Sequence, residues 1–443
     1  MSNQNVYSQW PSSVAAGPFL FFSAQMGFDA SGTQLVARYT DAPGGPEQAN
    51  TSYDWVASME APVGAQALAI YDHYRRALSA EGGLNQLLRY HIYQRDKHFF
   101  SVFDRIRRSF ESRPPASTAV GLGRFEPTDR ATLCVDAIAL RAAGEKPLGP
   151  RTVLPGAAHH TAAATFSHVI GAGEFLFLAG QIPIDASRPG SPLIRNYEDV
   201  PEQGRFLRVG RSHEDARNGP IAAQTWFTYD LIRQHLEANG SSMDHVLNVL
   251  VYLQDMRDFP VFHRVHERFF GARPPALTVI EAAEVGHKGT LIEIEPTAVK
   301  ATSGTAIQAF DPHGRRAPAR MSACVSAHGL AFFSGVIGES AIADSGQALA
   351  GDRYALQASA AVAELDQRFA AAGRSLADIA HLTVYVEDIL QFPVIERVLT
   401  ASLENWRPAL TVLEMPAVAP VRGACLALTA IGWFGDERME PQS

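Results

Sequence analysis

The sequence has little of what marks secreted, membrane-spanning or metal-binding proteins. Its 443 residues include three cysteines, Cys134, Cys324 and Cys425, and none is in a CxxC spacing. That argues against a disulfide framework and a zinc site, and favours a reducing compartment. No run of 18 apolar residues occurs, so we expect no membrane span. The first residues contain no basic stretch followed by an apolar core, so we expect no signal peptide and a cytoplasmic location.

Positive charge is also scarce. The formal net charge is -8, and the lysines and arginines are scattered along the chain. This pattern argues against nucleic acid and against an acidic membrane surface as partners. The composition, with 46% hydrophobic and 19% charged residues, is typical of a globular protein with a large core. The length suggests about three domains.

One short phrase occurs three times along the chain. Its copies are RPPASTAV at 113–120, RPPALTV at 273–279 and RPALTV at 407–412. Aromatic-rich apolar runs repeat in the same order and predict strands. The residues that open these runs, Gly17, Gly173 and His328, are offset by 156 and 155 residues. The spacing indicates three copies of one unit.

Each copy predicts the same order of elements. A helix is expected to open at a glutamine that lies 16 residues before a capping glycine. These glutamines are Gln66, Gln224 and Gln357. A strand and a second helix follow, and proline in the repeated phrase ends that helix. Each unit therefore reads β-(β)-α-β-α-β-β, an α/β sandwich with helices on one face of its sheet.

The units are separated by segments rich in small, polar, proline and glycine residues at 141–151 and 300–318. The sequence therefore predicts three domains. They comprise residues 1–143, 151–300 and 318–435, and the first two contain a long inserted loop.

The order AGQIP, glutamine helix, VYLQDMRDF, FFGARPPALTV and LIEIEPTAV resembles the Rid/YjgF family of small imine deaminases. The second repeat is the most similar, the third is clear, and the first is weaker but collinear. Members of this family form homotrimers, with a chorismate-mutase-like fold and ligand clefts between the subunits. The resemblance implies three tandem Rid-like α/β units that form a pseudo-trimer within one chain, either monomeric or a low-order homo-oligomer.

The resemblance also implies a ligand site. At two positions of that site, the chain has residues that differ from the family pattern. In the deaminases an arginine of the repeated phrase binds the substrate carboxylate, and a glutamate of the last strand orients water. The arginine position holds Ser117, Leu277 and Leu410, and the glutamate position holds Cys134, Glu293 and Ala427. With the arginine missing from all three copies, we expect poor turnover of simple imino acids such as 2-aminoacrylate.

Glu293 is the leading catalytic candidate, because burial in an apolar strand would raise its pKa and suit it to acid/base work. The competing interpretation is a carboxylate that faces solvent beside Glu295. His263, on the second helix of the same repeat, is the second catalytic candidate. Although His263 and His266 have a spacing that can hold a metal, no third ligand is evident, so we expect no metal.

The remaining candidates would bind substrate. The segment 186–219 carries three arginines that could replace the missing one, although a solvated loop is the simpler interpretation. The substrate-binding candidates are Phe166, Gly180, Gln181, Thr278, Arg205, Arg208 and Arg211.

We therefore expect a cofactor-free hydrolase, deaminase or lyase of the Rid-like superfamily in a specialised pathway. Its substrate would be a small reactive metabolite with an imine, enamine or related carbon. Two alternatives stay open. The first is chorismatase-like cleavage of an enolpyruvyl ether, which needs several cations that the expected cleft does not visibly supply. The second is a degenerate Rid protein that binds a ligand or a partner, which the loss of the three arginines favours.

Overall fold

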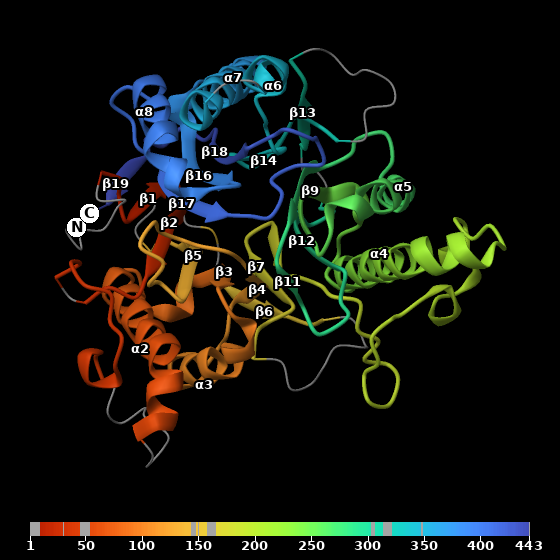
Figure 1. Ribbon diagram of the computed structural model, residues 1–443, viewed down its shortest axis with the longest axis horizontal. Helices are drawn as coiled ribbons and strands as arrows, with labels where there is room; N and C mark the ends of the chain where they lie inside the picture. The colour runs from red at the N-terminus through yellow and green to blue at the C-terminus, as the bar shows by residue number, and fades with distance from the viewer. Residues whose placement is uncertain are drawn as a thin grey trace.

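Three β-sheets meet at the centre of the computed structural model, and helices cover their outer faces (Figure 1). The structure describes residues 9–29, 31–44, 54–142, 148, 150–156, 165–302, 306–312, 321–346 and 349–442. The expected junctions between repeats lie partly outside these ranges. Within them, no helix is long and apolar enough to cross a membrane.

Each sheet draws its main strands from one repeat. Repeat 1 supplies β1 (Ser13–Ala16), β2 (Phe19–Met26), α2 (Asp54–Ala77), β3 (Leu87–Gln94), α3 (Phe100–Phe110), β4 (Ala116–Gly121) and β5 (Leu133–Leu140). Repeat 2 supplies β6 (Thr152–Leu154), β7 (Val169–Ala172), β8 (Phe175–Leu178), α4 (Ser212–Ala238), β9 (Val246–Leu253), α5 (Phe259–Phe269), β10 (Ala276–Glu281), β11 (Glu284–Val285) and β12 (Ile292–Val299). Repeat 3 supplies β13 (Gln308–Phe310), β14 (Cys324–Ala327), β15 (Leu330–Phe333), α6 (Glu339–Ser345), α7 (Ala350–Ala371), β16 (Ile379–Val386), α8 (Phe392–Ser402), β17 (Ala409–Glu414) and β18 (Leu426–Trp433), and β19 (Glu440–Gln442) follows.

The three sheets share one topology. The strand orders are β11-β4-β3-β5-β2-β1-β19, β10-β9-β12-β8-β7-β6 and β13-β14-β15-β18-β16-β17. In each sheet the strand of the repeated phrase pairs in parallel with the strand before it, as β10 does with β9, and the other pairings are antiparallel. The prediction of three Rid-like α/β units that form a pseudo-trimer within one chain is confirmed.

The repeats close into a ring through the strands that carry the repeated phrase. At each junction, the residue in the position of the missing arginine uses its own backbone to form a hydrogen bond with the next repeat. These contacts are Gly180 N to Ser117 O at 3.2 Å, Gly335 N to Leu277 O at 3.1 Å, and Leu410 N to Ser23 Oγ at 2.8 Å. The ring therefore has three junctions, 1–2, 2–3 and 3–1, each of which corresponds to one family cleft.

The repeated glutamines do not open their helices. Helices α2, α4 and α7 begin several residues earlier, and α2 and α4 run through Pro62 and Pro220. Proline usually interrupts a helix, but both helices continue through these residues. Each glutamine instead accepts a hydrogen bond from the backbone N–H just before the last strand of its repeat. The pairs are Gln66 with Thr132, Gln224 with Leu291, and Gln357 with Cys425.

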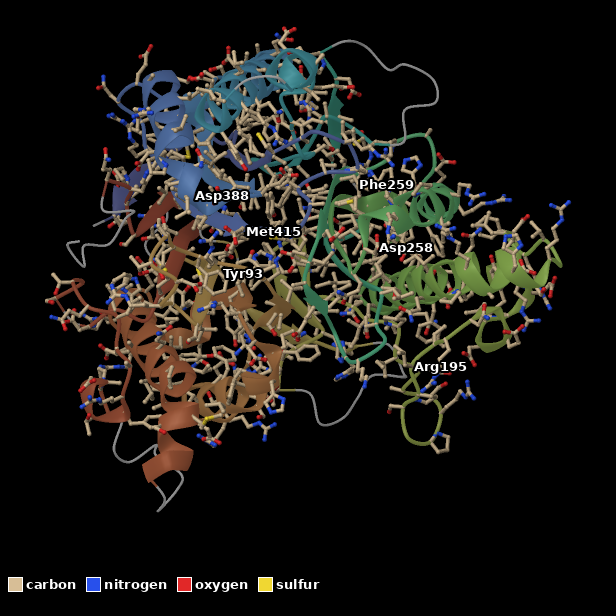
Figure 2. The ribbon with its side chains drawn as sticks, viewed as in Figure 1. Tyr93, Arg195, Asp258, Phe259, Asp388 and Met415 are labelled. Carbon is tan, nitrogen blue, oxygen red and sulfur yellow. The ribbon has the colours of Figure 1, made fainter. Side chains whose placement is uncertain are left out.

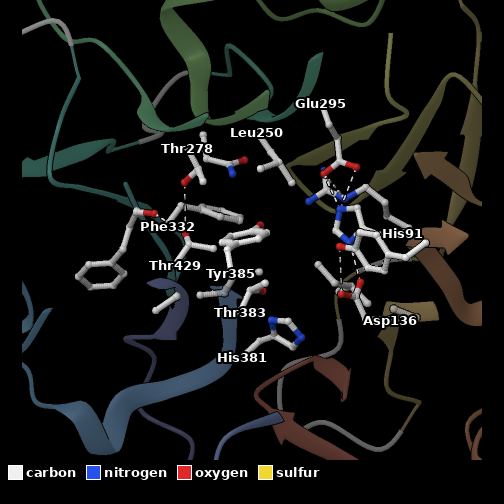
Figure 3. A pocket seen from close by; sticks show the side chains of 18 residues that line it. His91, Asp136, Leu250, Thr278, Glu295, Phe332, His381, Thr383, Tyr385 and Thr429 are labelled. Atoms are coloured by element: carbon white, nitrogen blue, oxygen red, sulfur yellow. Dashed lines mark hydrogen bonds and ion pairs between the residues drawn. The ribbon is translucent and has the colours of Figure 1, made fainter. Parts of the chain in front are cut away.

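A buried ionic network joins the three repeats beside a small central cavity of about 50 Å³ (Figure 3). His91 lies between two carboxylates, 2.6 Å from Asp136 and 2.9 Å from Glu295. The Glu295 carboxylate, from repeat 2, also pairs with Arg89 at 3.1 Å, and Thr411 of repeat 3 donates to Asp136 at 2.8 Å. Because Arg89, Asp136 and Glu295 are buried and the His91 side chain is only 15% exposed, each charge depends on its partners for stabilisation.

The pKa values in this network follow from the pairing. Burial alone would lower the pKa of His91, but the neighbouring carboxylates of Glu295 and Asp136 raise it to about 10. Burial alone would raise the pKa of both carboxyl groups. His91 lowers that of Asp136, and Arg89 together with His91 lowers that of Glu295. The imidazolium and both carboxylates are therefore charged at neutral pH.

Candidate active site

A cavity of about 860 Å³ lies at the 1–2 junction. Repeat 1 contributes the start of α3 and strand β4 to its wall, and repeat 2 contributes the end of β8, the turn after β11, and β12. A volume of this size is typical of small-molecule sites, and most of the residues that line this cavity are polar or charged. We call this cavity the 1–2 cleft.

Glu293, the second residue of β12, lies on the wall of the 1–2 cleft. Its side chain is buried, at 5% exposure, and its Oε2 has no hydrogen-bond partner within the described residues. Burial raises the pKa of this carboxyl to about 7, and the nearby Lys97 acts in the opposite direction. A carboxyl group that titrates near neutrality is suited to take up and release a proton.

Gly180 makes room for the Glu293 carboxyl. A Cβ on Gly180 would lie 2.2 Å from Glu293 Oε1 and 2.9 Å from Thr118 Oγ1. Any side chain at this position would therefore displace the carboxyl group. Glu295 does not face solvent beside Glu293, because it is 1% exposed and belongs to the central network.

Arg107 is a member of the cleft that the sequence did not indicate. It lies on α3 and is 1% exposed, and its guanidinium pairs with Asp104 at 2.6 Å and donates to Thr165. It also donates to Ser117 Oγ at 3.3 Å, and its Nε has no hydrogen-bond partner within the described residues. Ser117 stands where the family arginine was expected. A guanidinium therefore lies beside that position, supplied by a neighbouring helix.

Only some of the candidate binding residues lie together. Phe166 and Gly180 line the 1–2 cleft with Glu293. Gln181 is buried elsewhere, where its amide donates to Ala179 O at 2.9 Å and lies 3.1 Å from His235. Thr278 lines the central cavity instead (Figure 3). The structure therefore separates Gln181 and Thr278 from the cleft that holds Glu293.

His263 is not placed beside Glu293. It lies on α5, where its Nδ1 is 3.2 Å from Glu267 and its ring contacts Phe259. The 1–2 cleft takes its helix residues from α3 of repeat 1, so α5 has the corresponding place at the next junction, with repeat 3. Within the described residues no group of three possible ligands could hold a metal ion.

The three loop arginines also lie away from the cleft. Arg205 donates to Val200 O at 2.9 Å, Arg208 lies 3.9 Å from Glu198, and Arg211 lies 3.1 Å from Glu214. Their segment packs along the projecting first half of α4 (Figure 1), and Arg195 of the same segment lies far from the central Tyr93 (Figure 2). The segment packs against its own helix because α4 begins twelve residues before Gln224.

In the part of the chain that the structure describes, the other two junctions lack a comparable set of groups. At the 2–3 junction, Leu277 and Ala427 are apolar. At the 3–1 junction, burial raises the pKa of the Cys134 thiol well above its ordinary value, which keeps it protonated. Trp10 covers that junction and donates to Glu396 at 2.8 Å.

The comparisons with known proteins agree with this architecture. The family model described as Endoribonuclease L-PSP matches residues 157–300 and 314–424, more than half of the chain. A RutC family protein of Pyrococcus horikoshii is 36% identical over 30% of this chain and 86% of its own length. A 2-iminobutanoate/2-iminopropanoate deaminase of Dermatophagoides farinae is 24% identical over 34% of this chain and 91% of its own length.

A solved chorismatase structure is 13% identical and has a TM-score of 0.47, over 79% of this chain and 94% of that one. This likeness is too slight to bear on function. The family model and the RutC relative decide membership, because the model matches most of repeats 2 and 3 and the relative is matched over nearly its whole length. The chain belongs to the Endoribonuclease L-PSP family, the one that its sequence predicted under the name Rid/YjgF.

Proposed function

We propose that the chain is an enzyme that hydrolyses a small imine or enamine bearing a carboxylate in the 1–2 cleft. The observation that supports this most is the Glu293 carboxyl, which is buried, has a free oxygen and lies on the wall of a large cavity. The deaminase among the relatives gives the same reaction class. No other described junction has a carboxyl at this position.

The proposed mechanism assigns one task to each side chain. Arg107 holds the substrate carboxylate by charge-assisted hydrogen bonds, and Phe166 lies against the carbon skeleton. The Glu293 carboxylate takes a proton from water as the water attacks the C=N carbon. It then gives that proton to the departing nitrogen. Because Arg107 provides the guanidinium that β4 has lost, we now expect measurable turnover of simple imino acids.

Replacing Arg107 tests the assignment. We expect Arg107→Gln to lower kcat/KM about 10- to 150-fold, mainly through KM, because one charge-assisted contact contributes about 1.5–3 kcal/mol. The assay would follow hydrolysis of 2-iminobutanoate formed in situ from 2-aminobutanoate by an amino-acid oxidase. Arg108→Gln is the matched control, since Arg108 follows on the same helix and its side chain is 64% exposed.

Two results would contradict the proposal. Equal activity of Arg107→Gln and Arg108→Gln would remove Arg107 from the site. Absence of turnover in the unaltered chain, over a series of 2-imino acids of increasing size, would favour the degenerate, ligand-binding alternative.

A second candidate function gains support from the cations of the cleft. Cleavage of an enolpyruvyl ether needs groups for two carboxylates, and both Arg107 and Lys288 line the cavity. Incubation with chorismate decides between the two functions. Release of pyruvate without imine hydrolysis would transfer the assignment to ether cleavage.

A further inference from the structure

The chain contains four lysines, and two of them, Lys97 and Lys288, line the 1–2 cleft. Lys97 opens the short 3-10 helix η3 (Lys97–Phe99), which leads into α3. The same position in the other repeats holds Met256, at the start of η7 (Met256–Asp258), and Ile389, at the start of η9 (Ile389–Gln391). The junction that has the glutamate is thus also the one that has a lysine here.

The Lys97 amine is held between the two walls of the cleft. Its Nζ donates to Ala119 O of repeat 1 at 2.8 Å and to Gly286 O of repeat 2 at 3.1 Å. A neutral amine has two N–H bonds and one lone pair. With both N–H bonds directed to these carbonyls, the lone pair stays free to attack an electrophilic carbon.

The surroundings favour the neutral amine. Burial lowers the pKa of Lys97, while the carboxyl groups of Glu293 and Glu284 act in the opposite direction. The backbone N–H groups of Ala119 and Gly286 bond to the Glu293 carboxyl. Ala119 and Gly286 therefore contact the amine through their carbonyls and the acid/base group through their N–H groups. Lys97 and Glu293 also line the same cavity.

We propose that Lys97 is a nucleophile that captures 2-oxo acids and their imines as a Schiff base in the 1–2 cleft. This inference rests on the proposed function for the location of its site. It adds a covalent step in which this lysine, held by the carbonyls of Ala119 and Gly286, bonds to the substrate carbon.

The covalent step balances without a further reactant. The Lys97 lone pair bonds to the C=N carbon of the substrate, and a proton passes through Glu293 from the lysine nitrogen to the substrate nitrogen. The bond to the substrate nitrogen breaks, and ammonia leaves with the electron pair. Water then adds to the new C=N bond, the bond to lysine breaks, and the products are a 2-oxo acid and free Lys97.

Reductive trapping tests this step. The full chain would be incubated with 2-oxobutanoate and sodium cyanoborohydride, and the modified lysine located by peptide mass spectrometry. We expect Lys97 to be modified at least ~10-fold faster than Lys288, since the pKa of a desolvated amine is depressed. Lys288 is the internal control because it lines the same cavity.

Variants separate a nucleophile from a structural bridge. Lys97→Arg keeps a hydrogen-bond donor for the two carbonyls but forms no Schiff base, so trapping at this position should vanish while the fold is retained. Lys97→Met places at this position the residue type that repeat 2 has there, Met256. If Lys97 is modified no faster than Lys288, or if Lys97→Arg keeps full turnover of 2-iminobutanoate, the proposal is wrong.

The trapping result is independent of turnover. Imine hydrolysis with no adduct at Lys97 would overturn the covalent step and leave the proposed function standing. An adduct at Lys97 with no turnover of any imine would support the capture and contradict the proposed function.

Discussion

Replacement of Glu293 by glutamine is expected to lower kcat for 2-iminobutanoate about 100- to 10,000-fold, the usual loss when a general acid/base is removed. Glutamine has nearly the same shape but cannot accept a proton from water. The fold should stay intact, because glutamine keeps an oxygen for the N–H groups of Ala119 and Gly286, and Glu293 Oε2 has no hydrogen-bond partner within the described residues. The measurement is steady-state kinetics together with a thermal melt.

The control for this change is Glu284→Gln. Glu284 lines the same cavity, but its side chain is exposed. It should retain nearly full activity. If Glu293→Gln also retains full activity on a substrate that the chain turns over, the proton is moved by another group.

The pH dependence of kcat/KM gives a second readout of the same carboxyl. The base form of Glu293 is the deprotonated one, and its pKa is raised to about 7. The rate of the unaltered chain should therefore rise with pH, reach half its maximum near pH 7 and become level above it. In Glu293→Gln this rise should disappear. A rise that is unchanged in the variant would belong to a different group.

The second large effect is expected on stability. Glu295→Gln would remove the carboxylate that pairs with Arg89 and His91 at the centre of the ring. Arg89 would then lack its buried counter-charge and His91 would keep only Asp136, which costs about 3–5 kcal/mol in the free energy of unfolding. Urea unfolding at pH 6 would measure the loss.

Glu387→Gln is the matched control for Glu295. It breaks a carboxylate–arginine pair of 3.4 Å with Arg353, in which both side chains are about one-third exposed. Exposed pairs contribute less than about 1 kcal/mol. Equal losses in the two variants would show that the central network adds nothing beyond an ordinary surface pair.

The contribution of the network should also depend on pH in a defined way. The raised pKa of His91 makes its contribution complete below pH 6.5 and lost as the pH rises through about 10. The lowered pKa values of Asp136 and Glu295 make theirs complete above about pH 4.5 and lost in stronger acid. The stability difference between the unaltered chain and Glu295→Gln should therefore be largest between about pH 4.5 and 6.5.

The sequence predicted the architecture because repetition is a local signal. The phrase at 113–120, 273–279 and 407–412, and the strands and helices around it, are visible without knowledge of how the repeats meet. The same holds for Glu293, whose place in an apolar strand indicated burial. Burial and strand order depend mainly on residues close in the chain.

The rest of the site depended on contacts between repeats. His263 was grouped with Glu293 because both belong to repeat 2, whereas the 1–2 cleft takes its helix residues, including Arg107, from repeat 1. A sequence also does not show where a long segment packs. Arg205, Arg208 and Arg211 were therefore predicted to bind substrate, whereas their segment packs against α4. Arg107 lies six residues before the repeated phrase, outside the pattern that indicated the repeats.

A crystal structure of Glu293→Gln soaked with 2-oxobutanoate tests most directly whether the 1–2 cleft is the active site. We expect the ligand in that cleft alone, with its carboxylate on the Arg107 guanidinium and its second carbon beside residue 293. Ligand at the junction of Leu277 and Ala427, or at that of Leu410 and Cys134, with none beside Arg107, would contradict the account.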